Sequence, residues 1–156
     1  MNNLKYEIEN YLIKNFNKIK INSKDVVKGD VFVALKGKNN HGNMYINNVL
    51  NKKVKYIITD RKYNSYLDKK ILKVNNSLNF LKDIAIKKRN QFKGKIIAVT
   101  GSVGKTSTKE FLKFFLSSEG IVSASIKSYN NYLGVLISLI NINNKSLFAI
   151  FEVGTN

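Results

Sequence analysis

A glycine-containing loop between an apolar run and an amphipathic run constrains this 156-residue chain more than any other feature. Apolar residues 96–100 precede the loop 101–104, and apolar side chains then recur at helical spacing over residues 105–116. An apolar strand that turns through glycines directly into a helix is typical of proteins with a parallel sheet. The pattern therefore predicts a strand, a tight loop and a helix in this order.

The side chains of this loop fit the binding of nucleotide phosphates. Gly101 and Gly104 let backbone N–H groups approach phosphates, and the helix N-terminus adds the positive end of its dipole. Lys105 can reach the β- and γ-phosphates, and the Thr106 hydroxyl can ligate Mg²⁺. Val99 stands where the general pattern GxxxxGK[ST] has its first glycine, so a glycine-rich turn that only caps a helix is the alternative. The candidate nucleotide-binding residues are Gly101, Ser102, Val103, Gly104, Lys105, Thr106 and Ser107.

A phosphate loop of this kind needs an acidic residue on the magnesium side, at the end of a neighbouring strand. The apolar residues 147–151 are followed by Glu152, which supplies such a carboxylate. We predict that Thr106 and Glu152 are metal ligands, and that Lys105 and Glu152 are catalytic. A solvated glutamate at a strand end is the alternative interpretation.

The rest of the chain alternates predicted strands with predicted helices, which indicates an α/β fold with parallel sheets. A polar link at residues 91–95 divides the chain into a predicted domain 1–92 and a second α/β pattern from residue 93 on. Ser77 is the expected N-cap of the last helix before the link. The expected strands are 19–21, 31–35, 56–59, 71–74, 96–100, 121–124 and 147–153, and the expected helices are 3–16, 44–50, the helix after Ser77, 105–116 and 131–140.

The amino-acid composition limits the classes of function that this chain can have. There are 27 Lys and Arg against 10 Asp and Glu, a formal net charge of +17, which invites a nucleic-acid partner. Only Arg61 and Arg89 are arginines, however, and the lysines are spread along an asparagine-rich chain. We therefore attribute the positive charge to compositional drift at surface positions and expect no nucleic-acid partner. The chain has no cysteine, no signal peptide and no apolar run of membrane-spanning length, so we expect a soluble, cytoplasmic protein.

Several ordered motifs resemble one known family. They are TGSVGKTSTKE at residues 100–110, SYNNYLGVL at 128–136 and FEVGTN at 151–156, preceded by Ser23, GDVFVALKG at 29–37 and His41-Gly42. This set resembles the ATP-dependent Mur ligases of peptidoglycan synthesis over residues 21–156. Asn22, Lys24 and Leu136 depart from the Asp, Arg and Pro that the family usually carries at these places.

The resemblance implies a small N-terminal α/β domain for a UDP-sugar in residues 1–92, and the beginning of a P-loop (Rossmann-like) ATP-binding domain in residues 93–156. The implied reaction joins D-alanyl-D-alanine to UDP-MurNAc-tripeptide through an acyl phosphate, with ATP and Mg²⁺ as cofactors. The resemblance implies these substrates as the partners. It also implies a monomer that does not insert into a membrane. Because the later parts of the family's layout lie beyond residue 156, we expect this stretch alone to be inactive.

The resemblance also implies substrate residues. Ser23, Lys36 and Gly37 are candidates for the UDP end, and Asn131 is a candidate for the reacting phosphate or substrate. Turn formation remains the alternative for the first three, and helix capping for Asn131. His41 is expected to be a solvated loop residue, and Tyr129 and Tyr132 are expected to pack.

Three other functions remain open at this point. They are a stand-alone P-loop nucleotide-binding module, another Mur-type amide ligase and a basic nucleic-acid-binding protein.

Overall fold

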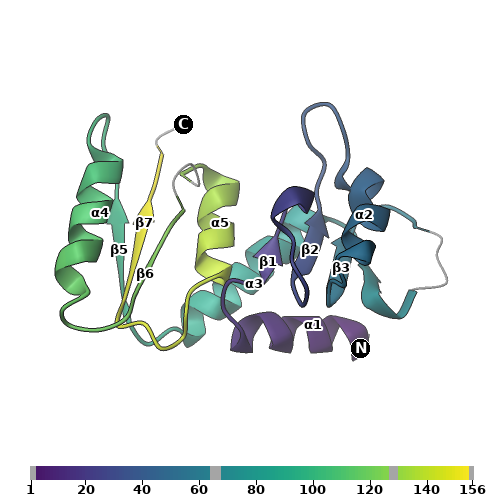
Figure 1. Ribbon diagram of the computed structural model, residues 1–156, viewed down its shortest axis with the longest axis horizontal. Coiled ribbons are helices and arrows are strands. Elements are labelled where there is room, and N and C mark those ends of the chain that lie inside the picture. Colours follow the sequence, from purple (N-terminus) through teal and green to yellow (C-terminus); the bar gives the residue numbers. More distant parts are fainter. Residues whose placement is uncertain (1–2, 64–67, 127–129, 155–156) are drawn as a thin grey trace. The chain divides into compact units, whose positions relative to one another are not determined.

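The computed structural model of the chain describes residues 3–63, 68–126 and 130–154 (Figure 1). Its contacts divide the chain into two compact units. The first comprises the described residues among 1–14 and 18–84, and the second comprises 15–17 and those among 85–156. Tyr129, which we expected to pack, lies outside the described residues.

The first unit is built on a four-stranded parallel sheet in the order β1-β2-β3-β4. All four residues of β2 are buried, and Phe32 and Ile57 pack in one core with Ile46 and Val49 of α2. Its strands are β1 (Ile19–Lys20), β2 (Val31–Ala34), β3 (Tyr56–Thr59) and β4 (Ile71–Lys73), and its helices are α1 (Asn3–Lys14), η1 (Ser23–Asp25), η2 (Gly42–Tyr45), α2 (Ile46–Asn51), η3 (Asp68–Lys70) and the start of α3 (Ser77–Gln91).

The second unit is built on a three-stranded parallel sheet in which β7 lies between β5 and β6 (Figure 1). Phe92, Ile142, Ala149 and Phe151 form its core cluster. In the register of β5 and β7, Val99 is opposite Glu152, so both strands end at the same edge. The elements are β5 (Lys95–Val99), α4 (Lys105–Leu116), β6 (Val122–Ala124), α5 (Tyr132–Ile140) and β7 (Phe148–Glu152).

The predicted α/β fold with parallel sheets is confirmed, and most predicted elements match within one or two residues. Two details differ. The predicted helix 44–50 divides into η2 and α2. Asn76 rather than Ser77 caps α3, because its Oδ1 accepts the Asn79 N–H at 2.8 Å. The contacts divide the chain within α3, between residues 84 and 85, and the domain boundary in the link 91–95 stays a prediction.

The apolar side chains of α4 do not all face the sheet. Phe111, Phe114 and Phe115 are 63%, 77% and 53% exposed. The Phe115 ring contacts the other two, and its centroid lies 4.4 Å from that of Phe111. Lys109 is the buried residue of the helix instead. Within the described residues, no helix has the length and apolar character needed to cross a membrane.

Candidate functional site

The loop after β5 takes the backbone form that its glycines allow. Gly101 has φ +147° and Gly104 has φ +77°, both in a region that residues with a Cβ rarely adopt. Gly104 stands directly before α4, and its carbonyl accepts the Thr108 N–H at 2.9 Å. Ser102 and Val103 are exposed between the two glycines. The loop thus leads from a strand into the N-terminus of a twelve-residue helix, which is where an anion binds favourably.

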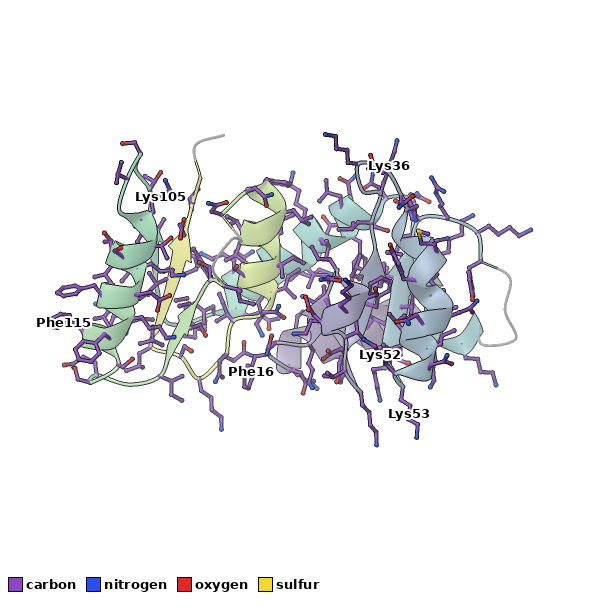
Figure 2. The ribbon with its side chains drawn as sticks, turned by 45° about the horizontal axis from the view of Figure 1, so that its top comes forward. Phe16, Lys36, Lys52, Lys53, Lys105 and Phe115 are labelled. Atoms are coloured by element: carbon purple, nitrogen blue, oxygen red, sulfur yellow. The ribbon has the colours of Figure 1, made fainter. Side chains whose placement is uncertain are left out.

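Lys105 lies against its own loop. Its Nζ donates a hydrogen bond to the Gly101 carbonyl at 2.5 Å, and the residue is only partly exposed (Figure 2). The ammonium group is therefore held at the mouth of the loop. If Lys105 exchanged this carbonyl for a phosphate oxygen, the new hydrogen bond would be stronger, because its donor and its acceptor would both be charged.

Glu152 lies beside the start of α4. The Thr106 hydroxyl donates a hydrogen bond to Glu152 Oε2 at 2.7 Å, and Asn130 Nδ2 donates a long one to Oε1 at 3.4 Å. Glu152 is 6% exposed. The hydrogen bond from Thr106 lowers the pKa of Glu152 most, and Asn130, Lys109 and Lys105 lower it further against the opposing effect of burial. The carboxylate is therefore held ionised.

The donor atoms at this edge fit magnesium. A hydroxyl and a carboxylate are hard oxygen ligands, and Mg²⁺ is usually bound by one or two such groups together with phosphates and water. Among the described residues, no three His, Cys, Asp or Glu side chains gather into a metal cage. Thr106 and Glu152 would hold such an ion, which would draw its remaining ligands from a bound polyphosphate and solvent.

Three polar residues around Glu152 were not predicted from the sequence. Asn130 donates to its carboxylate, Ser125 Oγ accepts its backbone N–H at 3.0 Å, and Lys109 contributes the nearby positive charge. Asn130 stands next to Asn131 in one of the family motifs, and Lys109 lies within another, so the motifs carried a signal for both. No sequence pattern pointed to Ser125.

Three of the remaining predicted residues have ordinary structural partners, whereas Tyr132, which we expected to pack, is 57% exposed. Ser23 opens η1, and its carbonyl accepts a hydrogen bond from Lys52 Nζ at 2.8 Å. Gly37 N–H donates to the Asn40 carbonyl at 2.8 Å in the exposed loop that carries Lys36 (Figure 2). Asn131 Oδ1 accepts the Gly134 N–H at 2.8 Å, so this residue caps α5, as the alternative interpretation held.

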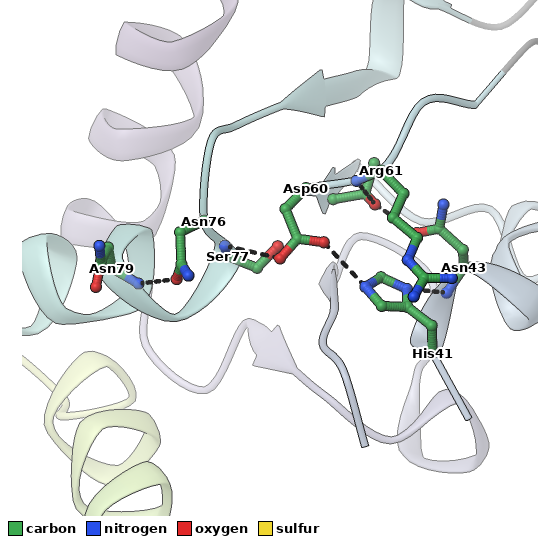
Figure 3. A network of polar contacts seen from close by, with 8 residues as sticks. His41, Asn43, Asp60, Arg61, Asn76, Ser77 and Asn79 are labelled. Carbon is green, nitrogen blue, oxygen red and sulfur yellow. Dashed lines mark hydrogen bonds and ion pairs between the residues drawn. The ribbon is translucent and has the colours of Figure 1, made fainter. Parts of the chain in front are cut away.

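His41 is buried, which corrects the expectation of a solvated loop residue. It is 9% exposed, and its Nδ1 accepts the Asn43 N–H at 3.1 Å (Figure 3). Nδ1 therefore carries no proton, so Nε2–H donates to Asp60 Oδ1 at 2.9 Å. Asp60 also accepts the Ser77 N–H at 3.4 Å. The pair joins the loop after β2 to the residue that follows β3.

β5, the glycine loop and α4 follow one another, and Glu152 ends the strand beside β5, which is the arrangement that the sequence predicted. The sequence profile of the Mur ligase middle domain matches residues 99–156. The chain is 46% identical over 142 residues to the UDP-N-acetylmuramoyl-tripeptide–D-alanyl-D-alanine ligase of Rickettsia prowazekii (strain Madrid E), a match that covers 91% of this chain and 31% of that protein.

Solved structures agree with the sequence match. MurF ligase from Thermotoga maritima, crystallised with ADP, superposes with a TM-score of 0.73 at 34% identity and covers 92% of this chain and 33% of that one. MurF from Acinetobacter baumannii superposes with a TM-score of 0.77 at 28% identity, covering 90% and 31%. Residues 99–156 therefore belong to the middle-domain family of the Mur ligases, and the chain spans about a third of the length of these relatives.

Proposed function

We propose that this chain is part of an ATP-dependent ligase that joins D-alanyl-D-alanine to UDP-MurNAc-tripeptide in peptidoglycan synthesis. The single observation that carries the proposal is the Thr106–Glu152 hydrogen bond of 2.7 Å. It joins the first turn of the helix after the phosphate loop to the acidic end of the neighbouring strand. The relatives that match over most of this chain carry the name of this ligase.

In the proposed reaction the loop binds the β- and γ-phosphates of ATP. Backbone N–H groups between Gly101 and Gly104 and the N-terminus of α4 point toward anionic oxygens. Lys105 exchanges the Gly101 carbonyl for a phosphate oxygen and so orients the γ-phosphoryl group toward the substrate carboxylate. Thr106 and Glu152 would hold Mg²⁺, and that ion would offset the charge on the transferring phosphoryl group.

The first unit is proposed to bind the UDP end of the substrate. Lys36 is an exposed cation on the loop that Gly37 and Asn40 close by a backbone hydrogen bond. A lysine on a short closed loop suits a diphosphate, because the loop limits where the charge can move. Ser23, at the start of η1, is the second candidate for this end. Substitution of Lys36 by Ala should weaken UDP binding in an NMR titration, whereas substitution of the exposed Lys62 should not.

Calorimetry with Mg-ATP and the full chain tests the nucleotide site. We expect binding by the wild type, and a loss of about tenfold or more in affinity for Lys105→Ala, because a charge-assisted hydrogen bond disappears. Lys113→Ala is the matched control, since Lys113 is an exposed lysine on the same helix. No binding of Mg-ATP by the wild type, or equal affinity of the Lys105→Ala variant, would contradict the proposal.

Turnover is a separate question from binding. Because the chain spans 31% of the length of the Rickettsia prowazekii relative, we expect that these 156 residues alone show no ATP hydrolysis dependent on D-alanyl-D-alanine. A phosphate-release assay with UDP-MurNAc-tripeptide and D-alanyl-D-alanine measures this directly. Turnover well above a blank would show that these residues are sufficient for the reaction.

A stand-alone nucleotide-binding module is the second candidate, favoured by the separate core cluster of the second unit. The two candidates differ in their response to the UDP-sugar substrate. A module binds Mg-ATP but not UDP-MurNAc-tripeptide, whereas the ligase part binds both. Titrating each compound separately into the same preparation distinguishes them.

A further inference from the structure

Lys109 is a charged side chain that is fully enclosed in the second unit. It lies one turn after Lys105 on α4, and its exposed fraction is 0%. Glu110 Oε1 lies 3.1 Å from its Nζ, but Glu110 is 56% exposed, so water screens this ion pair. An enclosed ammonium group destabilises the folded state unless other groups compensate it. Packing alone would be served better by an apolar side chain at this position of the helix.

The groups that compensate Lys109 belong to the end of the sheet. Its Nζ donates a hydrogen bond to the Ser125 carbonyl at 2.9 Å, in a fully buried environment. Ser125 directly follows β6 and is 5% exposed. Its own N–H donates to the Ile150 carbonyl at 2.9 Å, and its Oγ accepts the Glu152 N–H at 3.0 Å. Ser125 therefore connects the lysine on α4 to the last residue of β7.

Lys109 also acts on Glu152 through charge. Lys109 follows Lys105 by four residues and Thr106 by three, so it lies on the same side of α4 as both. Its positive charge lowers the pKa of Glu152, although less than the hydrogen bond from Thr106 does. The connection from Lys109 to the end of β7 is made by the hydrogen bonds through Ser125.

We propose that Lys109 is a positioning residue of the phosphate site. Through Ser125 it fixes the end of β7, so that the Glu152 carboxylate faces the Thr106 hydroxyl. Without the ammonium group, the Ser125 carbonyl loses its buried donor, so the residue whose Oγ accepts the Glu152 N–H is held less firmly. The inference rests on the proposed function, because it assumes that Thr106 and Glu152 serve a metal-bound nucleotide.

Lys109→Met tests the proposal, because it removes the charge and keeps the length of the side chain. Affinity for ATP is measured by calorimetry on the full chain, once with Mg²⁺ and once with EDTA. We expect the affinity for Mg-ATP to fall about 10-fold to 100-fold, as for other groups that orient a metal ligand, and the affinity for metal-free ATP to change little. Hydrogen exchange of the Glu152 amide, measured by NMR, should also become faster. Lys113→Met is the control and should match the wild type in all three measurements.

The outcomes distinguish a failure of the proposed function from a failure of the role proposed for Lys109. If the wild type does not bind Mg-ATP, both the proposed function and this inference fail. If the wild type binds and the Lys109→Met variant binds Mg-ATP equally well, only the inference fails. An equal loss with and without Mg²⁺ also overturns it, because it indicates general damage to the fold. Should Lys109→Met not fold, Ser125→Ala removes the second bond of the connection, from the Glu152 N–H to Ser125 Oγ, and must produce a metal-dependent loss as well.

Discussion

Thr106 and Glu152 show how much the state of one residue depends on its neighbours. The two are 46 positions apart, yet a 2.7 Å hydrogen bond joins them at the edge where β5 and β7 end. An enclosed glutamate would ordinarily have a raised pKa, because burial disfavours its charge. Here the hydrogen bond from Thr106 outweighs burial, and the pKa of Glu152 is lowered.

The lowered pKa of Glu152 predicts acid sensitivity. A carboxylate with a lower pKa when folded stabilises the protein above the pKa of the unfolded chain, about 4.3. This contribution is lost as the pH falls through the pKa of the folded state. We therefore expect the free energy of unfolding to fall less steeply below about pH 5 in Glu152→Gln than in the wild type. Urea unfolding between about pH 3 and pH 7 measures this free energy. The control is Glu119→Gln, at an exposed glutamate, which should behave as the wild type.

His41 predicts a loss of stability in the first unit. Replacing it by Ala leaves Asp60 Oδ1 and the Asn43 N–H without their partner. We expect a decrease of about 1–3 kcal/mol in the free energy of unfolding, measured by chemical denaturation. Lys38→Ala in the same loop removes an exposed side chain and should change it by less than about 0.5 kcal/mol. A His41→Ala variant as stable as this control would show that the network contributes nothing.

Among the elements, the connection into β5 depends on a close approach of backbone segments. A Cβ at Gly94 would lie 2.6 Å from the carbonyl oxygens of Ser146 and Leu147. Lys95 N–H donates to that Leu147 carbonyl at 2.8 Å, so the two segments cannot separate without losing the bond. Gly94→Ala should therefore lower the free energy of unfolding by about 1–3 kcal/mol. Lys93→Ala, at the exposed preceding residue, is the control, and equal stability of the two variants would contradict the prediction.

Helix α3 contains a second enclosed lysine. Lys88 is 0% exposed, and burial lowers its pKa to about 8. Between this value and the ordinary pKa of lysine, about 10.4, the unfolded chain binds one proton more than the folded one. Stability therefore rises with pH in this window. Lys88→Met should remove the rise, whereas Lys87→Met should keep it, as measured by urea unfolding at about pH 7.5 and pH 10. A rise that persists in Lys88→Met would refute the assignment.

At the scale of the whole molecule, the net positive charge affects the stability of the fold. Excess positive charge destabilises a compact state through self-repulsion, and salt screens this repulsion over a Debye length of about 10 Å at 0.1 M. With a net charge of +17, we expect the melting temperature to rise between about 10 mM and 300 mM NaCl. Calorimetry measures the melting temperature in sodium chloride, and in sucrose at matched osmolality as the control. A melting temperature that is independent of salt would contradict the prediction.

Much of the fold could be predicted, because the relevant signals are local. The boundaries of β3 and α4 follow from apolar spacing, and Asn131 caps α5 through its own next turn. Glu152 could be placed beside the phosphate loop, since parallel strands end at a common edge. His41 could not be placed, because its partner Asp60 is 19 residues away and no periodicity connects them.

The sequence by itself determined the order of strands and helices along the chain, the glycine loop and the likeness to Mur ligases, because backbone conformation and motif chemistry depend on residues a few positions apart. Only the tertiary structure decided which side of α4 is buried. Apolar spacing favoured the phenylalanines, but Lys109 is enclosed and Phe114 is 77% exposed. The reason is physical: burial depends on what the rest of the sheet offers, and here Ser125 and Glu152 offer the partners that an enclosed ammonium group requires.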